Sequence, residues 1–161
     1  MRLTRRKSYH VEPGYVYFSE KAMTLRAVVG SCVAVCLWDR KSKVGGMNHF
    51  IKPRTRAKAD ATPIYGNVAI AALLKMMEDA GCKRDNLIAH VLGGGAPDGA
   101  SAPTLGEQNL ASAREALQRK RITVIAEDSG GPVGRKIAFD TGTGEIAVLK
   151  TMNVRAGDWY I

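Results

Sequence analysis

Two residues, Cys32 and His49, have the types and the setting that thiol catalysis requires. Cys32 follows Gly30-Ser31 at a break in an apolar, valine-rich segment, where glycine permits a sharp turn or the close approach of a substrate. A cysteine is a nucleophile only as the thiolate, and a neighbouring imidazole can remove its proton. Backbone N–H groups at Gly30 and Ser31 are candidates for stabilising the oxyanion that forms when sulfur attacks a carbonyl. Spacing alone leaves the alternative open, because a cysteine in such a strand and a histidine beside Phe50 are more often core residues.

A zinc site is the competing interpretation of the same residues. Cys32, Cys36, His49 and His90 are potential ligands, and the C-x3-C spacing lies within the range of structural zinc sites. A second ligand pair at matching spacing is missing. In an extended strand, the two cysteines would lie more than about 10 Å apart, too far to share one ion. We therefore expect no metal.

The residues around the two candidates predict a hairpin that brings them together. Residues 24–38 are almost continuously apolar, which is typical of a buried strand, and residues 39–43 form a polar turn. The chain returns through residues 44–51, a second predicted strand. An antiparallel pairing of these strands would bring Cys32 and His49 near each other.

The rest of the chain predicts two principal helices and further strands. Apolar residues recur at helical spacing around residues 70–77, and Gly81 stands where a helix commonly ends. The second helix is expected at residues 105–119. The other strands are expected at residues 15–18, 87–92, 122–126, 136–140 and 145–149. This mixture predicts an α+β fold with mixed or antiparallel sheets.

The glycine run Gly93-Gly94-Gly95 follows one of these predicted strands. No lysine-serine or lysine-threonine pair follows it, so a phosphate-binding loop is not indicated. We expect the run to shape a turn or to form a backbone wall beside the active site.

The length of 161 residues suits one domain with a single sizeable core. We expect a loosely held basic leader at residues 1–12 and one domain at residues 13–161. No apolar run approaches the length of a bilayer span, and the basic N-terminus lacks the apolar stretch of a signal peptide. Three cysteines form no disulfide framework, and we expect them to be thiols in a reducing compartment. These features predict a cytoplasmic protein without membrane insertion.

The formal net charge of +9 is concentrated near the N-terminus and in the stretch Lys52 to Lys58. Aromatic residues make up only 6% of the chain, the basic segments contain none, and no nucleic-acid-binding motif is present. Nucleic acid is therefore not indicated. The charge predicts either a docking surface for an acidic protein or a plain solvated face.

Motifs spread from about residue 13 to residue 150 resemble the CheD family, the chemoreceptor glutamine deamidases of bacterial and archaeal chemotaxis. Each motif is weak alone, but their order and spacing together are specific. They are V-G-S-C-V-A-V-C-L-W-D at residues 29–39, G-G-M-N-H-F at 45–50, Y-G-N at 65–67, G-G-A at 94–96, L-G-E-Q-N at 105–109, A-E-D-S-G-G at 126–131 and T-G-E at 143–145.

The resemblance implies a cysteine hydrolase that acts on side-chain amide C–N bonds, a protein-glutamine glutaminase. Cys32 would be the nucleophile and His49 the general base and acid, with water resolving the thioester. No metal or organic cofactor is implied. The implied fold is similar to the catalytic domain of the cytotoxic necrotizing factor toxins. The implied partners are methyl-accepting chemotaxis receptors, whose glutamines become glutamates, and a CheC-type phosphatase.

Two other function classes stay open beside the deamidase. One is a non-catalytic docking or regulatory protein that binds receptors or a CheC-type phosphatase. The other is a different thiol acyl-transfer enzyme, such as a protease or a transglutaminase. A site that reaches glutamines on a helical receptor is expected to be shallow and open.

The chain departs from the family at the expected third catalytic residue. The family commonly has a threonine six residues before the cysteine, where this chain has Arg26. Thr24 lies two positions further upstream. Either Thr24 fills the role, or the group that orients the histidine is absent.

Overall fold

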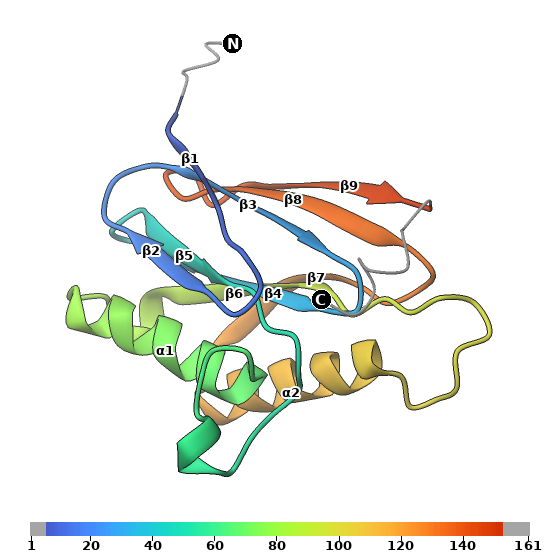
Figure 1. The fold of residues 1–161 in the computed structure, drawn as a ribbon. Helices are drawn as coiled ribbons and strands as arrows, with labels where there is room; N and C mark the ends of the chain where they lie inside the picture. Colours follow the sequence, from blue (N-terminus) through green and yellow to red (C-terminus); the bar gives the residue numbers. More distant parts are fainter. Residues whose placement is uncertain (1–5, 153–161) are drawn as a thin grey trace.

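Two β-sheets are stacked face to face, and two helices cover the outer face of one sheet (Figure 1). The computed structural model describes residues 6–152. The first sheet has the strand order β1-β3-β8-β9 and the second β2-β5-β4-β6-β7. The strands are β1 Ser8–His10, β2 Val16–Ser19, β3 Thr24–Val29, β4 Val33–Asp39, β5 Val44–Asn48, β6 Leu87–Gly93, β7 Thr123–Ser129, β8 Gly134–Asp140 and β9 Ile146–Thr151.

Both sheets are mixed. The pairs β1·β3 and β6·β7 are parallel, and the other neighbouring pairs are antiparallel. The helices are α1 Gly66–Asp79 and α2 Leu105–Arg119, with short 3-10 turns at Lys58–Asp60 and Arg84–Asn86. The predicted α+β class with two principal helices is therefore confirmed. No helix in the described part of the chain is long and apolar enough to cross a membrane.

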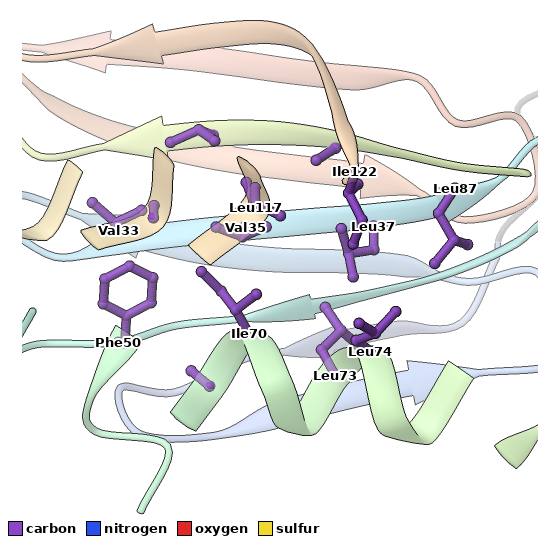
Figure 2. Packing of buried hydrophobic residues seen from close by; sticks show 14 of the residues in the cluster. Val33, Val35, Leu37, Phe50, Ile70, Leu73, Leu74, Leu87, Leu117 and Ile122 are labelled. Atoms are coloured by element: carbon purple, nitrogen blue, oxygen red, sulfur yellow. The ribbon is translucent and has the colours of Figure 1, made fainter. Parts of the chain in front are cut away.

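Strand β4 lies at the centre of the second sheet, and all seven of its residues are buried. Its odd-numbered side chains face the helices, where Val35 and Leu37 share a cluster with Ile70 and Leu73 of α1 (Figure 2). Its even-numbered side chains belong to a second cluster with residues of β3 and β8 in the first sheet. A strand covered on both faces must be apolar throughout, which explains the uninterrupted valine-rich sequence.

Local sequence signals mark the start of α2 and the end of α1. The Thr104 side chain accepts a hydrogen bond from the N–H of Glu107, and the Glu107 carboxylate accepts one from the N–H of Thr104. This reciprocal pair satisfies N–H groups that the first turn of α2 leaves unpaired. After α1, Gly81 has a φ of +96°, a conformation that favours glycine.

The predicted hairpin is confirmed, because β4 and β5 are antiparallel with Cys36 opposite Met47. The prediction of a single interrupted strand over residues 24–38 is wrong. Residues 24–29 form β3 in the first sheet, and β4 belongs to the second. The break at Gly30-Ser31 therefore carries the chain from one sheet to the other.

Part of the expected N-terminal leader belongs to the fold. Residues 8–10 form β1, which pairs in parallel with β3, and Val11 is completely buried. The description of residues 1–12 as loosely held is therefore corrected for residues 8–11. Residues 1–5 lie outside the described part of the chain.

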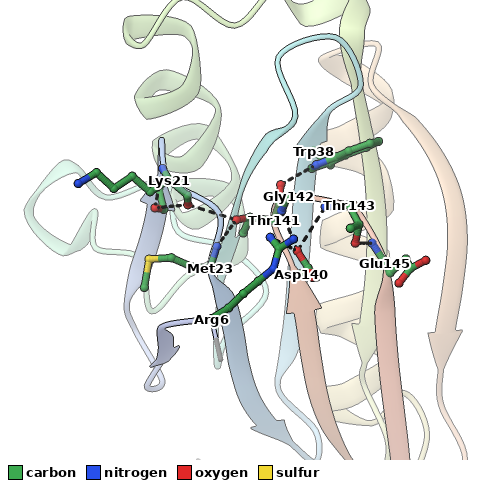
Figure 3. Close-up of polar contacts among 10 residues, drawn as sticks. Arg6, Lys21, Met23, Trp38, Asp140, Thr141, Gly142, Thr143 and Glu145 are labelled. Carbon is green, nitrogen blue, oxygen red and sulfur yellow. Dashed lines mark hydrogen bonds and ion pairs between the residues drawn. The ribbon is translucent and has the colours of Figure 1, made fainter. Parts of the chain in front are cut away.

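A hydrogen-bonded cluster at the β8–β9 turn ties the two sheets together (Figure 3). The indole N–H of Trp38, on β4, donates to the carbonyl oxygen of Thr141 over 2.8 Å. The hydroxyl of Thr141 accepts the N–H of Met23 at 2.9 Å, just before β3. The Asp140 carboxylate pairs with Arg6 at 2.9 Å and accepts the N–H of Gly142. The residues of this turn thus also join the two layers.

Truncation of Leu73 should test the packing between α1 and β4. Leu73→Ala is expected to lower the free energy of unfolding by about 2–5 kcal/mol, because it leaves a cavity in a fully buried cluster. Met76→Ala on the exposed side of the same helix (39% exposed) should cost less than about 0.5 kcal/mol. Urea unfolding followed by circular dichroism measures both, and equal losses would contradict the packing described.

Candidate active site

Cys32 and His49 lie on one face of the β4–β5 hairpin, beside its last backbone pair. Val33 and Phe50 exchange both backbone hydrogen bonds, at 3.1 and 3.0 Å, which sets Cys32 opposite Ile51. The same register sets His49 opposite Ala34. Because side chains alternate along a strand, Cys32 and His49 project from the same face as diagonal neighbours. Diagonal Cα atoms lie about 7–8 Å apart in such pairs, within reach of an imidazole.

The backbone N–H and carbonyl of His49 point away from β4 and pair with the chain before β2. Its N–H donates to the carbonyl oxygen of Tyr15 at 3.2 Å, and its own carbonyl accepts the N–H of Gly14 at 2.7 Å. The N–H of Val35 on β4 is satisfied instead by the Asn48 side chain, at 2.9 Å. Asn48 thus replaces a missing backbone acceptor next to His49, so the buried strand keeps its hydrogen bonds.

The His49 ring is held in one tautomer. Its Nδ1 lies 2.9 Å from the carbonyl oxygen of Val11, and because a carbonyl only accepts, Nδ1 carries the proton. Nε2 therefore presents a lone pair, and it is buried without a partner among residues 6–152. Burial lowers the pKa of His49, against an opposing effect of the Val11 hydrogen bond. The ring is a neutral base at pH 7.

Cys32 is completely buried, with 0% of its surface exposed, and His49 is 1% exposed. Burial raises the pKa of the Cys32 thiol to about 12, against the opposing effect of a backbone hydrogen bond. The resting site is thus a thiol beside a neutral imidazole, not a thiolate–imidazolium pair. The expectation of a shallow, open site is corrected, because desolvation by the surrounding strands dominates at the end of β4.

The glycine run packs directly on the turn that carries Cys32. The N–H of Gly94 donates to the carbonyl of Cys32 at 2.8 Å, and the N–H of Gly95 to that of Gly30 at 2.9 Å. A Cβ on Gly93, whose φ is +110°, would lie 2.3 Å from the Cys32 carbonyl oxygen. The run therefore forms a backbone wall beside the candidate nucleophile, as the sequence predicts.

The oxyanion candidates Gly30 and Ser31 are both buried in this turn. Ser31 also lines a cavity of about 320 Å³ between the glycine run and the N-terminus of α2. The other walls of the cavity come from residues 95–97, 100–101 and 103–106. A side chain entering this cavity would approach the Ser31-Cys32 peptide.

Thr24 is not brought together with Cys32 and His49. The odd-numbered side chains of β3, Leu25, Ala27 and Val29, share the buried cluster with Cys32. Thr24 lies half-buried among the even-numbered residues, on the other face of β3, as does Arg26, which is exposed. The group in contact with His49 Nδ1 is instead the Val11 carbonyl.

No group of three or more His, Cys, Asp and Glu residues within residues 6–152 is placed to hold a metal ion. His90 lies on β6 opposite Cys36. Its Nε2 is buried without a partner among the described residues, and burial lowers its pKa. His90 contacts the cavity between the sheets, separate from the cavity beside Ser31.

Two further groups lie at the site that the sequence does not mark as candidates. One is the Val11 carbonyl, for which the sequence has no signal because every residue carries a carbonyl. The other is Asn109 of α2, which is fully buried and donates from Nδ2 to the carbonyl oxygens of Ser31 and Ile51, both at 2.9 Å. A polar residue on the apolar face of a predicted helix, beside Leu110 and Ala113, was the available signal for Asn109.

Comparison with known proteins identifies one family. Residues 52–150 match the family described as CheD, CheD chemotactic sensory transduction, a range that begins just after His49. Proteins named probable chemoreceptor glutamine deamidase CheD match more of the chain. The protein of Sulfurimonas denitrificans is 36% identical over 140 residues, covering 85% of this chain and 90% of its own length. That of Trichlorobacter lovleyi is 40% identical over 143 residues, covering 87% and 88%.

The buried thiol predicts an unusual pH dependence for alkylation of Cys32 by iodoacetamide. Because a pKa of about 12 keeps the sulfur protonated, Cys32 should react at pH 8 at least about 100-fold more slowly than the same residue in urea. Its rate should still rise between pH 9 and 10, where an ordinary thiol approaches a plateau. Peptide mass spectrometry resolves the three cysteines. A plateau below pH 8 would show a preformed thiolate and contradict the neutral resting pair.

Proposed function

This chain belongs to the CheD family, and on that premise we propose that it is a chemoreceptor glutamine deamidase that uses Cys32 and His49. The observation that carries the proposal is the placement of both side chains on one hairpin face, with the Nε2 lone pair of His49 unpartnered among the described residues. A cysteine beside a neutral, oriented imidazole is the arrangement that general-base activation of a thiol requires.

The proposed reaction hydrolyses the side-chain amide in two halves. His49 Nε2 takes the Cys32 proton as sulfur attacks the amide carbon, and N–H groups of the Gly30-Ser31 turn stabilise the resulting oxyanion. His49 then protonates the departing nitrogen, which leaves as ammonia, and a thioester remains on Cys32. Water attacks the thioester with His49 as base, giving glutamate and the original thiol. The Val11 carbonyl holds the ring orientation through both halves.

The Val11 carbonyl also bears on the candidate role of Thr24. A third group is needed to fix the tautomer of the histidine, and the 2.9 Å contact with Val11 already does so. We therefore expect Thr24→Val to change the rate of deamidation by less than about twofold, since Thr24 lies on the other face of β3. A loss of more than about tenfold would return Thr24 to the catalytic set.

The proposed partners are methyl-accepting chemotaxis receptors, in keeping with the names of the relatives. A cleft of about 240 Å³ offers a cationic surface for docking. Four cations, Arg54, Arg56, Arg119 and Lys120, line it together with a single acid, Glu115, which pairs with Arg54 and Arg119. The strand-rich α+β architecture is also compatible with the proposed similarity to the cytotoxic necrotizing factor catalytic domain. We place the activity in the cytoplasm, where a thiol stays reduced.

A docking or regulatory protein without catalysis is the second candidate function, with receptors or a CheC-type phosphatase as partners. The complete burial of Cys32 favours it, because a receptor glutamine must reach a sulfur that solvent does not contact. A deamidase would have to admit the glutamine by a movement of the surrounding loops. The two candidates differ in whether ammonia is released.

Mass spectrometry of a receptor cytoplasmic fragment incubated with the protein tests the deamidase. Specific glutamine peptides should gain the mass difference between an amide and an acid with wild type, and the rate should fall at least about 1,000-fold in Cys32→Ala and His49→Ala. Cys82→Ser, on the opposite side of β4 in the helix-facing cluster, is the matched control and should keep wild-type activity. Binding without a mass change in any variant would identify a docking regulator. Cleaved peptides or incorporated amines would identify a protease or a transglutaminase.

Charge reversal should test the cationic cleft as the docking surface. Arg56→Glu together with Lys120→Glu is expected to raise the KM for the receptor fragment at least about tenfold at low salt, with kcat within about twofold. Raising the salt concentration should weaken wild-type binding more than binding of the variant. Arg26→Glu together with Lys136→Glu, exposed on the outer face of the first sheet, is the control. Equal effects of both double variants would show that only net charge matters.

A further inference from the structure

Asn109 joins the two segments that carry the candidate nucleophile and base. Its Nδ2 donates to the carbonyl oxygen of Ser31, the residue before Cys32, and to that of Ile51, two residues after His49. Both distances are 2.9 Å. Ile51 is also the residue opposite Cys32 in the β4–β5 register. One amide group therefore spans the turn and the strand at the point where the backbone ladder ends.

Few side chains can make this connection. An amide nitrogen donates two hydrogen bonds in one plane, whereas a hydroxyl donates one and a carboxylate none. Asn109 uses both donors and leaves its Oδ1 buried without a partner among residues 6–152. An unpaired buried acceptor lowers the stability of the fold, so stability alone does not favour asparagine at position 109. What Asn109 contributes is the pair of hydrogen bonds that it donates to Ser31 and Ile51.

The helix that carries Asn109 is itself fixed against the active-site wall. The reciprocal Thr104–Glu107 cap starts α2 just before Asn109. A Cβ on Gly106 would lie 2.3 Å from the carbonyl oxygen of Gly94, so the helix touches the glycine run. Gly94 in turn donates to the carbonyl of Cys32. Asn109 therefore bridges three rigid elements and has little freedom to follow a moving partner.

The Val33–Phe50 pair holds the two strands together next to Cys32 and His49. Just beyond this pair, the Asn109 amide connects the carbonyl oxygens of Ser31 and Ile51, so it closes the end of the ladder beside both side chains. We propose that Asn109 is a positioning residue that sets the distance between Cys32 and His49 by holding the Ser31 and Ile51 carbonyls together. A shift of about 1 Å in reacting groups can cost about 100-fold in rate. This inference rests on the proposed function.

The test compares Asn109→Ala with Thr141→Ala. Thr141 is a matched control, because it is also fully buried and its hydroxyl also bonds two backbone groups, the N–H of Met23 and the carbonyl of Lys21, at the opposite end of β4 from Cys32. Asn109→Ala should lower kcat for ammonia release from the receptor fragment at least about 30-fold, with KM within about twofold. Thr141→Ala should change kcat by less than about threefold. Equal kcat losses, scaled to the folded fraction at the assay temperature, would overturn the proposal.

Alkylation of Cys32 gives a readout that needs no receptor. Loosening the turn should admit water to the sulfur, so Asn109→Ala should react with iodoacetamide at pH 8 at least about tenfold faster than wild type. Cys36, in the middle of β4, should keep its wild-type alkylation rate. An unchanged Cys36 rate therefore distinguishes a local change at Cys32 from general unfolding. An unchanged Cys32 rate would overturn the proposal. If wild type releases no ammonia, the deamidase proposal fails while this measurement still decides the role of Asn109.

Asn109→Ser is a second variant that keeps the proposal testable if Asn109→Ala does not fold. Serine is small enough for the site and retains one donor, so it should restore part of the kcat lost in Asn109→Ala and slow the alkylation of Cys32 toward the wild-type rate. If Asn109→Ala is unfolded, Asn109→Ser is compared directly with wild type. A folded Asn109→Ser protein with wild-type kcat and wild-type alkylation of Cys32 would overturn the proposal.

Discussion

The burial of β4 on both faces is the constraint on which the site depends. Seven consecutive residues face either the helices or the first sheet, and none contacts bulk water appreciably. Cys32 stands at the entrance to this strand and shares its desolvation, which raises the pKa of the thiol. Charge is costly in such a place, so the Cys32 thiol and the His49 imidazole rest in their neutral forms. The same packing that stabilises the fold therefore sets the resting protonation state of the site.

In the proposed reaction, a neutral resting pair moves the charge separation to the moment of attack. The thiolate would form only as the proton passes to His49, whose Nδ1 is already bonded to the Val11 carbonyl. No reorientation of the ring is then required during proton transfer. A thiol that is protonated and buried is also protected from oxidation and from adventitious electrophiles, because reactivity follows the thiolate and its exposure. Such a site would suit the proposed deamidase, whose substrate must enter before the sulfur becomes reactive.

The site is assembled from segments that are distant along the chain. The Val11 carbonyl comes from the segment after β1, Cys32 from the turn between the sheets, and Asn109 from α2. The glycine run after β6 supplies the wall, where any Cβ at Gly93 would collide with the Cys32 carbonyl. Each contact involves a backbone group, either as the partner of a side-chain or backbone hydrogen bond or in a close approach, which explains why glycine and asparagine occur at these points.

The sequence by itself determined the hairpin, both helices and the proximity of Cys32 to His49 on that hairpin, because local periodicity and turn residues encode elements and their neighbours. It also supplied the family, through motifs whose order spans most of the chain. Only the tertiary structure decided that β3 and β4 belong to different sheets and that Cys32 is buried. It alone showed the hydrogen bonds that the Val11 carbonyl and Asn109 make at the site. Burial and long-range hydrogen bonds arise from contacts between elements far apart in sequence, which no local pattern records.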